Sequence, residues 1–600
     1  MRLSPAVVIA PSRPSSGLFA RLLSRDVRCA APMVIYLLVF LITPIFQLLK
    51  MSFLPHGEWG LANYTRLFAA PVYLDVLAIT FKTAAWTTLL AVIGGYPVAY
   101  LTTIASPRFK SSLLFWILLP FWTSFLVRTF AWIVLLGRNG VINQWLQAMG
   151  MTHAPANMLY NFGAVLVGMV HAMMPIAILT MMSVMANIDR TLPRAALTLG
   201  ARPARAFWTV YFPLSLPGVA AAAIMVFVTA LGFFITPALL GGPHQTMITQ
   251  LIIDQVLQTL NWGFAGAISL LLLVTVLIVF VLYDRFIGLS TLTGGEPTSA
   301  ASGQRSNGLA RRAGFAVLES LATLCDAIGA AFSRVWPPRH GRSGKHPALW
   351  AIAIVTLVFL IAPTLLMIPV SFTSASAIDW PPQGFSLQWY GVIAHAPTWG
   401  SAALRSLIIG IATGILSMLI GVPAAFLLVR SKVRWRAVFF AFALLPMIVP
   451  RMILAVGLFY LLARLQLIGS IIGMVLGHTT VALPYVVVTM TAILKNYDVR
   501  LDAAAASLGA NRWTTLRHVT FPILGAGFVS SFLFAFVTSF DELTIALFVT
   551  SGLNSTLPKQ FWDEVTLSVS PTIAAVSTCL FVFSALVIWC ANRLRSRGTA

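Results

Sequence analysis

The chain has 600 residues, of which 59% are hydrophobic and only 9% are charged. Soluble domains carry about 25% charged residues, so this composition excludes an ordinary soluble protein and indicates an integral membrane protein. The formal net charge is +23, but the Lys and Arg residues lie in short, separate segments rather than on one continuous soluble surface. Binding of nucleic acid needs positive charge gathered on one surface, so we expect a lipid bilayer, and no nucleic acid, as the partner of this chain.

Twelve apolar segments are long enough to cross a bilayer, which requires about 20 residues per helix. The six in the first half lie at 32–53, 77–104, 110–137, 161–186, 208–240 and 265–287. The six in the second half lie at 347–373, 400–429, 435–462, 470–493, 519–549 and 571–592. The fold class expected is an all-α integral membrane protein.

Positive charge alternates along the loops between these segments. Most of the 39 Lys and Arg residues fall in the N-terminal tail, in every second loop, in the central segment and in the C-terminal tail. Because cytoplasmic loops are enriched in Lys and Arg, we predict that these segments, and both termini, lie in the cytoplasm.

The chain divides into five parts. We predict a cytoplasmic tail (1–31), a six-helix module (32–287), a cytoplasmic linker (288–346), a second six-helix module (347–592) and a short cytoplasmic tail (593–600). Within the linker, apolar residues recur every three or four positions, which predicts an amphipathic helix on the inner membrane surface. Those residues are Leu321, Leu324, Ile328, Phe332 and Val335. A solvated spacer with accidental periodicity is the alternative.

A repeat connects the two modules. The stretch "LGARPARAFWTVYFP" (199–213) returns as "LGANRWTTLRHVTFP" (508–522), at a constant offset of 309 residues. The preceding residues, "ANIDRTLPRAALTLGA" (186–201), return as "KNYDVRLDAAAASLGA" (495–510). Six spans bring each module back to its starting side. The repeat therefore predicts a parallel pseudo-two-fold arrangement, with a pathway between the halves.

The repeated loop lies between the fourth and fifth predicted spans of each module. Small residues there let another surface approach closely, and each glycine suits a helix C-terminus with positive φ. Pro213 and Pro522 fit the first turn of the next helix. The candidate contact residues are Ala195, Ala196, Leu199, Gly200 and Ala201 in the first copy and Ala504, Ala505, Leu508, Gly509 and Ala510 in the second. We predict a short helix–turn–helix offered to the cytosol; an ordinary connection is the alternative.

This loop resembles the "EAA" signature of inner-membrane permeases of binding-protein-dependent ABC importers. The two alanines and the glycine match in both copies, but the signature's Glu is replaced by Arg194 and by Ala503, with Asp502 beside the latter. The resemblance implies that two copies of a cytoplasmic ABC ATPase grip the two loops. It also implies that a periplasmic solute-binding protein delivers the solute, and that the chain resides in a bacterial inner membrane.

Other stretches resemble particular permeases. "LLPFWTSFLVRTFAWIVLLGRNGVINQWL" (118–146) is similar to the first permease of spermidine/putrescine-type importers. "WPPQGFSLQWY" (380–390), "SFDELTIALFVT" (539–550) and "TLPKQFWDEVTLSVSPTIAAVST" (556–578) are similar to their second permease. The chain therefore resembles two permeases fused end to end. This implies a polyamine as the solute; ferric iron, opines and phosphonates remain alternatives.

The chain itself is expected to be a transport subunit rather than an enzyme, without a cofactor of its own. "GRSGKH" (341–346) lacks the spacing of a phosphate-binding loop and follows no strand, so ATP is expected on the partner ATPase. The rival function is a secondary transporter of six plus six spans, which needs a relay of buried carboxylates or histidines. Only His171 and His478, isolated in the fourth spans, resemble such a relay, and we favour the importer.

Charged residues within predicted spans are the candidates for the solute pathway. Asp541 and Glu542 are the only acidic residues well inside a span, and Arg128 and Arg451 are basic residues inside others. The carboxylates can attract a cationic solute, with Trp122, and also Phe121 and Trp132, offering aromatic faces. Alternatively, the acids and arginines neutralise one another as structural ion pairs. No metal site is expected, because Cys29, Cys325, Cys579 and Cys590 show no metal-ligand spacing.

Overall fold

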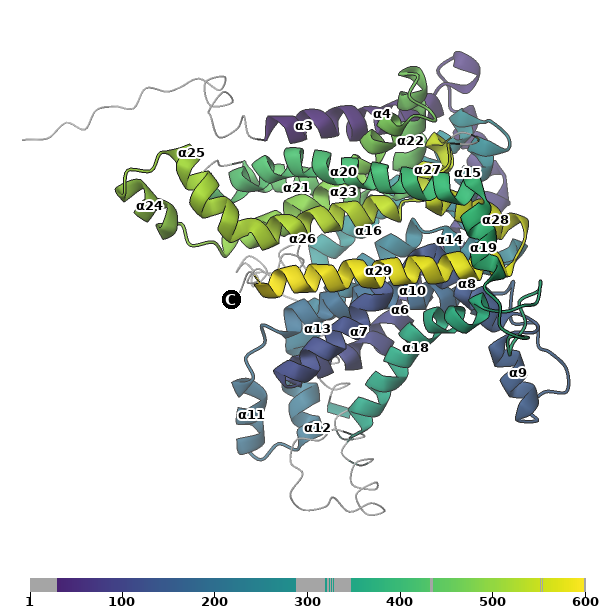
Figure 1. Ribbon diagram of the computed structural model, residues 1–600, viewed down its shortest axis with the longest axis horizontal. Coiled ribbons are helices and arrows are strands. Elements are labelled where there is room, and N and C mark those ends of the chain that lie inside the picture. Colours follow the sequence, from purple (N-terminus) through teal and green to yellow (C-terminus); the bar gives the residue numbers. More distant parts are fainter. Residues whose placement is uncertain are drawn as a thin grey trace, which may run out of the picture.

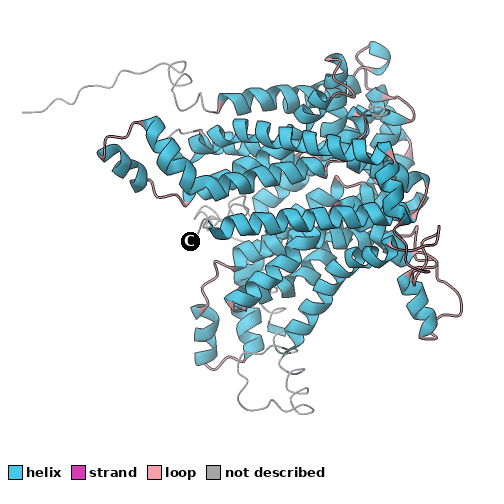
Figure 2. Cartoon of the chain, viewed as in Figure 1, coloured by secondary structure: helices cyan, strands magenta, loops and turns pink. Residues whose placement is uncertain are grey.

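The computed structural model describes residues 30–286, 319–320, 323, 325, 327, 347–431, 435–550, 552 and 554–597. Throughout these residues the regular structure is helical, as Figure 2 shows. Helices are expected in hydrocarbon because they satisfy every backbone N–H and C=O within the segment. The predicted all-α class is thus confirmed.

The first module comprises the elements up to residue 286. They are α3 (Ala31–Leu37), η1 (Leu38–Ile42), α4 (Thr43–Ser52), η2 (Pro55–Gly57), α5 (Ala62–Ala69), α6 (Pro71–Ile104), α7 (Pro107–Trp122), α8 (Phe125–Leu136), α9 (Val141–Ala148), α10 (Phe162–Met185), α11 (Thr191–Thr198), α12 (Pro203–Ala206), η3 (Phe207–Tyr211), α13 (Phe212–Leu231), α14 (Ile235–Leu240), η4 (Pro243–Gln245), α15 (Ile248–Leu257) and α16 (Trp262–Phe286).

The second module repeats most of this order from residue 347, and its described residues contain no counterparts of η1, η2, α9 and η4. Its elements are α18 (Pro347–Ser371), α19 (Gln388–His395), α20 (Pro397–Arg430), α21 (Arg436–Ile448), α22 (Arg451–Arg464), α23 (Ile471–Lys495), α24 (Arg500–Ser507), α25 (Arg512–Thr515), η7 (Leu516–Thr520), α26 (Phe521–Phe540), α27 (Thr544–Val549), α28 (Leu557–Leu567) and α29 (Pro571–Arg597).

All twelve predicted spans contain helix, but the third and fifth of each module are not the continuous helices that were predicted. Within the described chain, ten helices are long and apolar enough to cross a membrane, or eleven if the pair α21 and α22, bent by 93°, is one span. The predicted span 110–137 is likewise divided, into α7 and α8. The fifth spans end at Leu231 and Phe540, and the residues after them form the short helices α14 and α27.

Local backbone chemistry accounts for these breaks. Thr123 and Ser124 are extended between α7 and α8, and the Ser124 hydroxyl accepts a hydrogen bond from the Leu126 N–H, which caps α8. Val449 is extended because the residue before a proline, here Pro450, is disfavoured in the helical conformation. Hydropathy runs on through both breaks, which is why composition alone did not reveal them.

Three five-residue π-helical turns in the described chain end two residues before a proline. η1 precedes Pro44, η3 precedes Pro213 and η7 precedes Pro522. A proline lacks the N–H that the carbonyl four residues earlier would accept, and its ring crowds that carbonyl, so the preceding turn widens. Pro213 and Pro522 do lie in the first turn of α13 and α26, as predicted.

The first span of each module packs against the other module. Helix α4 packs on α22, and α18 packs on α6 and α8 (Figure 1). The Tyr36 hydroxyl donates to the Leu476 carbonyl, and Nε2 of His171 lies 3.0 Å from the Leu360 carbonyl oxygen. Because each of these bonds joins an exchanged first span to a fourth span of the opposite module, the two halves form one interlocked bundle.

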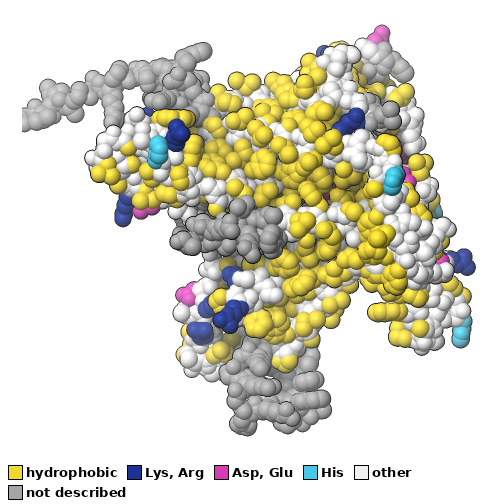
Figure 3. Space-filling view, in the orientation of Figure 1, with side chains coloured by type: hydrophobic (Ala, Val, Ile, Leu, Met, Phe, Trp, Pro, Cys, Tyr) yellow, Lys and Arg dark blue, Asp and Glu magenta, His cyan; other side chains and the backbone are white. Residues whose placement is uncertain are grey.

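The polar extensions gather at the two ends of this bundle. Figure 1 shows α11 and α12, and also α24 and α25, projecting from one end, with α9, α19 and α28 at the other. On the face in Figure 3, hydrophobic side chains cover the middle, and Lys and Arg side chains mark the projecting loops. Both repeated loops therefore lie on the same side, as a parallel repeat requires.

The tails and most of the linker lie outside the described residues, so the predicted domain boundaries stay predictions. In the predicted amphipathic helix, Glu319, Ser320, Thr323, Cys325 and Ala327 are described, and all are helical. The apolar positions that defined its stripe, Leu321, Leu324, Ile328, Phe332 and Val335, lie outside the described residues.

Candidate functional site

Each repeated loop contains a short helix, α11 or α24, which we call the loop helices. Both begin in the same way. The Asp189 carboxylate accepts a 2.9 Å hydrogen bond from the Thr191 N–H, and the Asp498 carboxylate accepts a 2.9 Å bond from the Arg500 N–H. Hydrogen bonding by the Thr191 backbone lowers the pKa of Asp189, which keeps this cap ionised. These aspartates occupy matching positions of the repeat.

The loop helices also end in the same way. Gly200 has φ of +88° and Gly509 has φ of +84°, the left-handed conformation predicted for both. The next N–H, of Ala201 or Ala510, donates a 3.0 Å hydrogen bond to the carbonyl five residues earlier. This pattern is a Schellman motif, in which glycine terminates a helix at low steric cost.

The leucine before each glycine projects from the protein. Leu199 is 88% exposed and Leu508 is 89% exposed, and a Cβ atom added at either glycine would meet nothing within 4 Å. Ala195 and Ala504 are exposed as well, but Ala505 is buried, so the predicted surface of small residues is incomplete in the second copy. The two exposed leucines therefore occupy matching positions at the tips of the two capped loop helices.

Of the charged residues of the predicted pathway, Arg128 and Glu542 are buried in the bundle, whereas Asp541 is half-buried and the Arg451 side chain is 41% exposed. Glu542 is 1% exposed, and its Oε2 atom lies 3.2 Å from Nη1 of Arg451. Its Oε1 atom accepts a 3.1 Å hydrogen bond from the Ile545 N–H, at the start of α27. The Glu542 side chain therefore has both oxygens engaged, in an ion pair between α22 and α27 and in a helix cap.

Arg128 is buried, and no carboxylate of the described residues forms an ion pair with it. Its Nη1 atom donates a 3.3 Å hydrogen bond to the Ala172 carbonyl, and its guanidinium lies 4.3 Å from the centre of the Phe125 ring. It interacts electrostatically with Asp541. Arg128 is therefore a buried positive charge inside the first module, within electrostatic range of Asp541.

Asp541 lies at the junction of the modules. It lines a small pocket with Trp122 and Ser124, from the break between α7 and α8, and with Phe540 and Phe583 of the second module. The Trp122 ring centre is 4.9 Å from that of Phe534 on α26. The pocket therefore combines one carboxylate with aromatic faces, and both modules contribute to it.

Trp132 does not line this pocket. Its ring is buried against His171 and Phe359, where α18 packs on the first module. His171 and His478 are separate, buried hydrogen-bonding groups: Nδ1 of His478 lies 2.8 Å from the Ser539 hydroxyl. In the described part of the chain, the hydrogen bonds found for these two rings lead to the Leu360 carbonyl and the Ser539 hydroxyl rather than to carboxylates.

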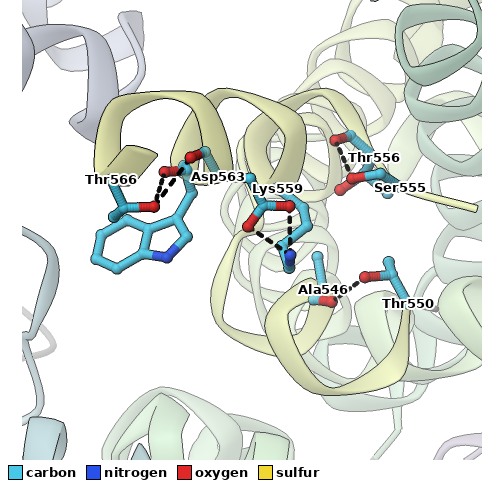
Figure 4. Close-up of polar contacts among 8 residues, drawn as sticks. Ala546, Thr550, Ser555, Thr556, Lys559, Asp563 and Thr566 are labelled. Atoms are coloured by element: carbon cyan, nitrogen blue, oxygen red, sulfur yellow. Dashed lines mark hydrogen bonds and ion pairs between the residues drawn. The ribbon is translucent and has the colours of Figure 1, made fainter. Parts of the chain in front are cut away.

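Helix α28 closes the bundle at the end opposite the loop helices. Figure 4 shows Lys559 reaching both carboxylate oxygens of Asp563 one turn further on, 2.6 Å from Oδ1. Phe561 is buried edge-on against Phe130 of α8, and the Trp562 ring lies 5.5 Å from that of Phe234. Helix α28, whose sequence was noted only for its similarity to a second permease, therefore bridges the two modules.

The sequence matches a family model twice. The model describes a binding-protein-dependent transport system inner membrane component, and it matches residues 91–288 and 417–597. The chain belongs to this family. It is the permease component of an ABC importer, a multi-pass protein of the inner membrane, with one module in each half.

Each half of the permease also has relatives of its own. The chain is 33% identical over 256 residues to the spermidine/putrescine transport system permease protein PotB of Haemophilus influenzae, covering 41% of this chain and 89% of that protein. It is 31% identical over 257 residues to PotC of Escherichia coli, covering 43% of this chain and 94% of that protein. The matches confirm a double permease formed from two fused halves.

Among solved structures, one chain of a bacterial alginate ABC transporter, in complex with an alginate pentasaccharide-bound periplasmic protein, is similar at 17% identity and a TM-score of 0.41. That match covers 46% of the permease and 99% of the alginate transporter chain. Within the described residues of the permease, no three His, Cys, Asp or Glu side chains are grouped so as to hold a metal ion.

Proposed function

We propose that the permease forms both halves of the translocation pathway in an ATP-driven polyamine importer. The observation that carries this proposal is the pair of matching loop helices, capped alike and projecting at the same end, each with an exposed leucine. One polypeptide then supplies what its PotB and PotC relatives supply as separate proteins.

Two copies of a cytoplasmic ABC ATPase engage the loop helices. Leu199 and Leu508 each enter a groove on one ATPase copy, and the rigid caps transmit its movement to the bundle. ATP acts because the ATP-bound ATPase dimer has different affinities for the two conformations of the permease, without which no conformational shift occurs. The permease carries no nucleotide itself; ATP stays on its partner.

A solute-binding protein docks at the opposite end, where α9, α19 and α28 lie. The family's description names a binding-protein-dependent system, which supports this partner. The exchange of first spans makes a movement of one module displace helices of the other. Docking at one end and ATP at the other therefore act on the same interlocked bundle.

The polyamine assignment has two supports. The first is the set of spermidine/putrescine relatives, which cover each half of the chain. The second is the pocket of Asp541, where a carboxylate and the ring of Trp122 suit an ammonium group. Glu542 is held by Arg451, so we assign it a structural role and assign the solute contact to Asp541.

Transport in proteoliposomes tests the proposal. The permease is reconstituted with the cognate ATPase and the cognate binding protein, and radiolabelled spermidine is followed. We expect uptake that requires ATP and the ATPase, and that an Asp541→Asn variant reduces by at least about tenfold, the value of one ionic contact of about 1.5 kcal/mol. Asp75→Asn, which alters an exposed aspartate on α6 outside the proposed docking helices, is the matched control and keeps uptake near normal.

Two outcomes would contradict the proposal. Uptake that persists without the ATPase and stops with an ionophore identifies a secondary transporter. ATP-dependent uptake of ferric iron, an opine or a phosphonate, with spermidine ignored, retains the importer but rejects the polyamine.

A further inference from the structure

The two loop helices are attached to the bundle by different chemistry, and the difference centres on Asp502. This carboxylate lies in the first turn of α24, and its side chain is 19% exposed. Its Oδ2 atom lies 2.8 Å from Nη1 of Arg430, the last residue of α20. Its Oδ1 atom accepts hydrogen bonds from the Tyr497 hydroxyl, at 2.6 Å, and from the Thr520 hydroxyl, at 3.0 Å.

These contacts join four segments through one side chain. They are the end of α20, the turn after α23, the loop helix α24 and the π-helical turn η7 that leads into α26. Thr520 is fully buried, and Tyr497 is buried in a hydrophobic cluster with Leu494 and Leu524. The Arg430 guanidinium also lies 5.3 Å from the centre of the Tyr497 ring. Asp502 on α24 binds Arg430 on α20, and its other two partners, Tyr497 and Thr520, are themselves buried. Helices α24 and α20 are therefore constrained to move together.

The Tyr497 phenol must be protonated in order to donate its hydrogen bond to Asp502. Burial, with a further contribution from the hydrogen bond to Asp502, raises the pKa of the Tyr497 phenol above its ordinary value. The phenol therefore remains a donor at physiological pH, and Asp502 keeps its three partners.

The first module lacks the same connection. The repeat places Pro193 where Asp502 stands and Ile188 where Tyr497 stands, and α6 ends in Ile104 where α20 ends in Arg430. None of the ion pairs found among the described residues involves α11. Instead, α11 packs beside η3, whose Tyr211 ring lies 4.8 Å from that of Tyr100 on α6.

We propose that Asp502 is a positioning residue that fastens the second loop helix to α20, so that the two ATPase copies drive the permease unequally, with the second half as the stiffer lever. Its carboxylate faces the bundle rather than the ATPase. This inference rests on the proposed function, because it takes α11 and α24 to be the sites where the ATPases engage.

The test separates ATPase docking from transmission. Spin labels are placed at Trp145 and Leu387, exposed positions of different modules near the outer end, in a background in which the four cysteines are replaced by serine. The complete complex with its ATPase and binding protein is held in nanodiscs. ATP turnover and the ATP-induced change in the distance between the labels are measured on the same sample.

For Asp502→Asn we expect the ATPase to bind and to hydrolyse ATP, while the ratio of shifted to unshifted complexes falls by about tenfold, the value of a charge-assisted network. Arg430→Gln should act similarly. Arg430→Lys, which keeps the ionic contact and leaves the other two partners of Asp502 in place, should retain most of the shift. Thermal unfolding of Asp502→Asn at the temperature of the unaltered permease would exclude a loss of folding as the cause. Pro193→Asn, at the matching position of α11, is the control and should leave the shift unchanged.

Each result has one meaning. If Asp502→Asn and Arg430→Gln leave the distance change intact while ATPase binding is normal, the positioning role is wrong. If the unaltered complex itself shows no ATP-induced change, the proposed function fails instead. If Pro193→Asn is as damaging as Asp502→Asn, the asymmetry between the loop helices is refuted.

Discussion

Helix α11 packs beside an aromatic cluster, whereas helix α24 is fastened to α20 by a carboxylate. The two helices share their caps, their positive-φ glycine and their exposed leucine. The surface offered to a partner is thus the same in both modules, and the attachment behind it differs. A duplicated module can keep its outward geometry while the residues beneath it change from polar to aromatic.

A second comparison concerns the ends of the fifth spans. The second module has Asp541 and Glu542 after α26, and the repeat places Gly232 and Phe233 after α13. A Cβ atom added at Gly232 would lie 3.3 Å from the Cβ of Pro450, at the break of the second module. The junction after α26 is therefore charged and borders a pocket, whereas the junction after α13 is closely packed and apolar.

The largest expected effect tests the charged junction. Glu542→Ala removes the partner of Arg451, whose own side chain is 41% exposed, and the cap of α27, and we expect the two losses together to lower the free energy of unfolding by about 2–3 kcal/mol. Thermal unfolding of the purified permease in detergent measures this. The double variant Glu542→Gln with Arg451→Met should be less harmful than Glu542→Ala alone, because no charge is left unpaired. Unchanged stability in Glu542→Ala would show that the pair is not structural.

The exposed leucines provide the next test, in which the loop helices should behave alike. Leu199→Asp and Leu508→Asp each put a charge in place of a leucine whose burial against the ATPase would contribute about 2 kcal/mol of binding free energy. We expect each to weaken ATPase binding by about thirtyfold, measured as the concentration of ATPase needed for half-saturation. Leu567→Asp, an equally exposed leucine at the other end, is the control. Normal binding by either loop variant would remove that helix from the contact.

The glycines give a smaller effect of the same kind. A β-branched residue is strained at positive φ by about 1–2 kcal/mol, whereas asparagine tolerates it better. Gly200→Val and Gly509→Val should therefore reduce the ATPase recovered with the permease by at least about fivefold, and Gly200→Asn and Gly509→Asn by less. Equal recovery with Val and Asn would mean that the left-handed turn does not set the position of the leucine.

The smallest effect should come from the contact between the linker and the first loop. Arg205 and Glu319 form a 2.7 Å ion pair, but both side chains are 57% exposed. Exposed pairs contribute about 0–1 kcal/mol, so Arg205→Gln should leave uptake and stability almost unchanged. A strong loss of ATP-driven uptake in this variant would indicate that the linker holds α11 as Asp502 holds α24, and would remove the asymmetry.

Local chemistry made the loops predictable from sequence. Gly200, Gly509, Pro213 and Pro522 have backbone requirements that follow from their covalent structure, and their repetition gave the positions. A separate consideration predicted that an arginine neutralises Glu542. Few charged residues lie within the spans, so each of them has few possible partners.

Tertiary choices were not predictable in this way. Hydropathy is continuous across Thr123 and Ser124, so the third span looked unbroken, and nothing in an apolar stretch specifies that α4 packs on the opposite module. The sequence also left the role of Trp132 open, since an aromatic side chain within a span suits both packing and solute contact; its ring packs against His171 and Phe359. Asp502 was visible in the sequence, but its partner Arg430 is 72 residues away and only the fold brings them together.

The central claim is that each loop helix is bound by one copy of the ATPase. Cross-linking tests this claim most directly. Leu199→Cys and Leu508→Cys, each in the cysteine-free background, are treated with a short bifunctional maleimide in inside-out vesicles that contain the ATPase. The account predicts a permease–ATPase adduct from both positions, and protection from an impermeant maleimide added to right-side-out cells. Labelling of either cysteine from outside the cell, or no adduct from an intact complex, would contradict it.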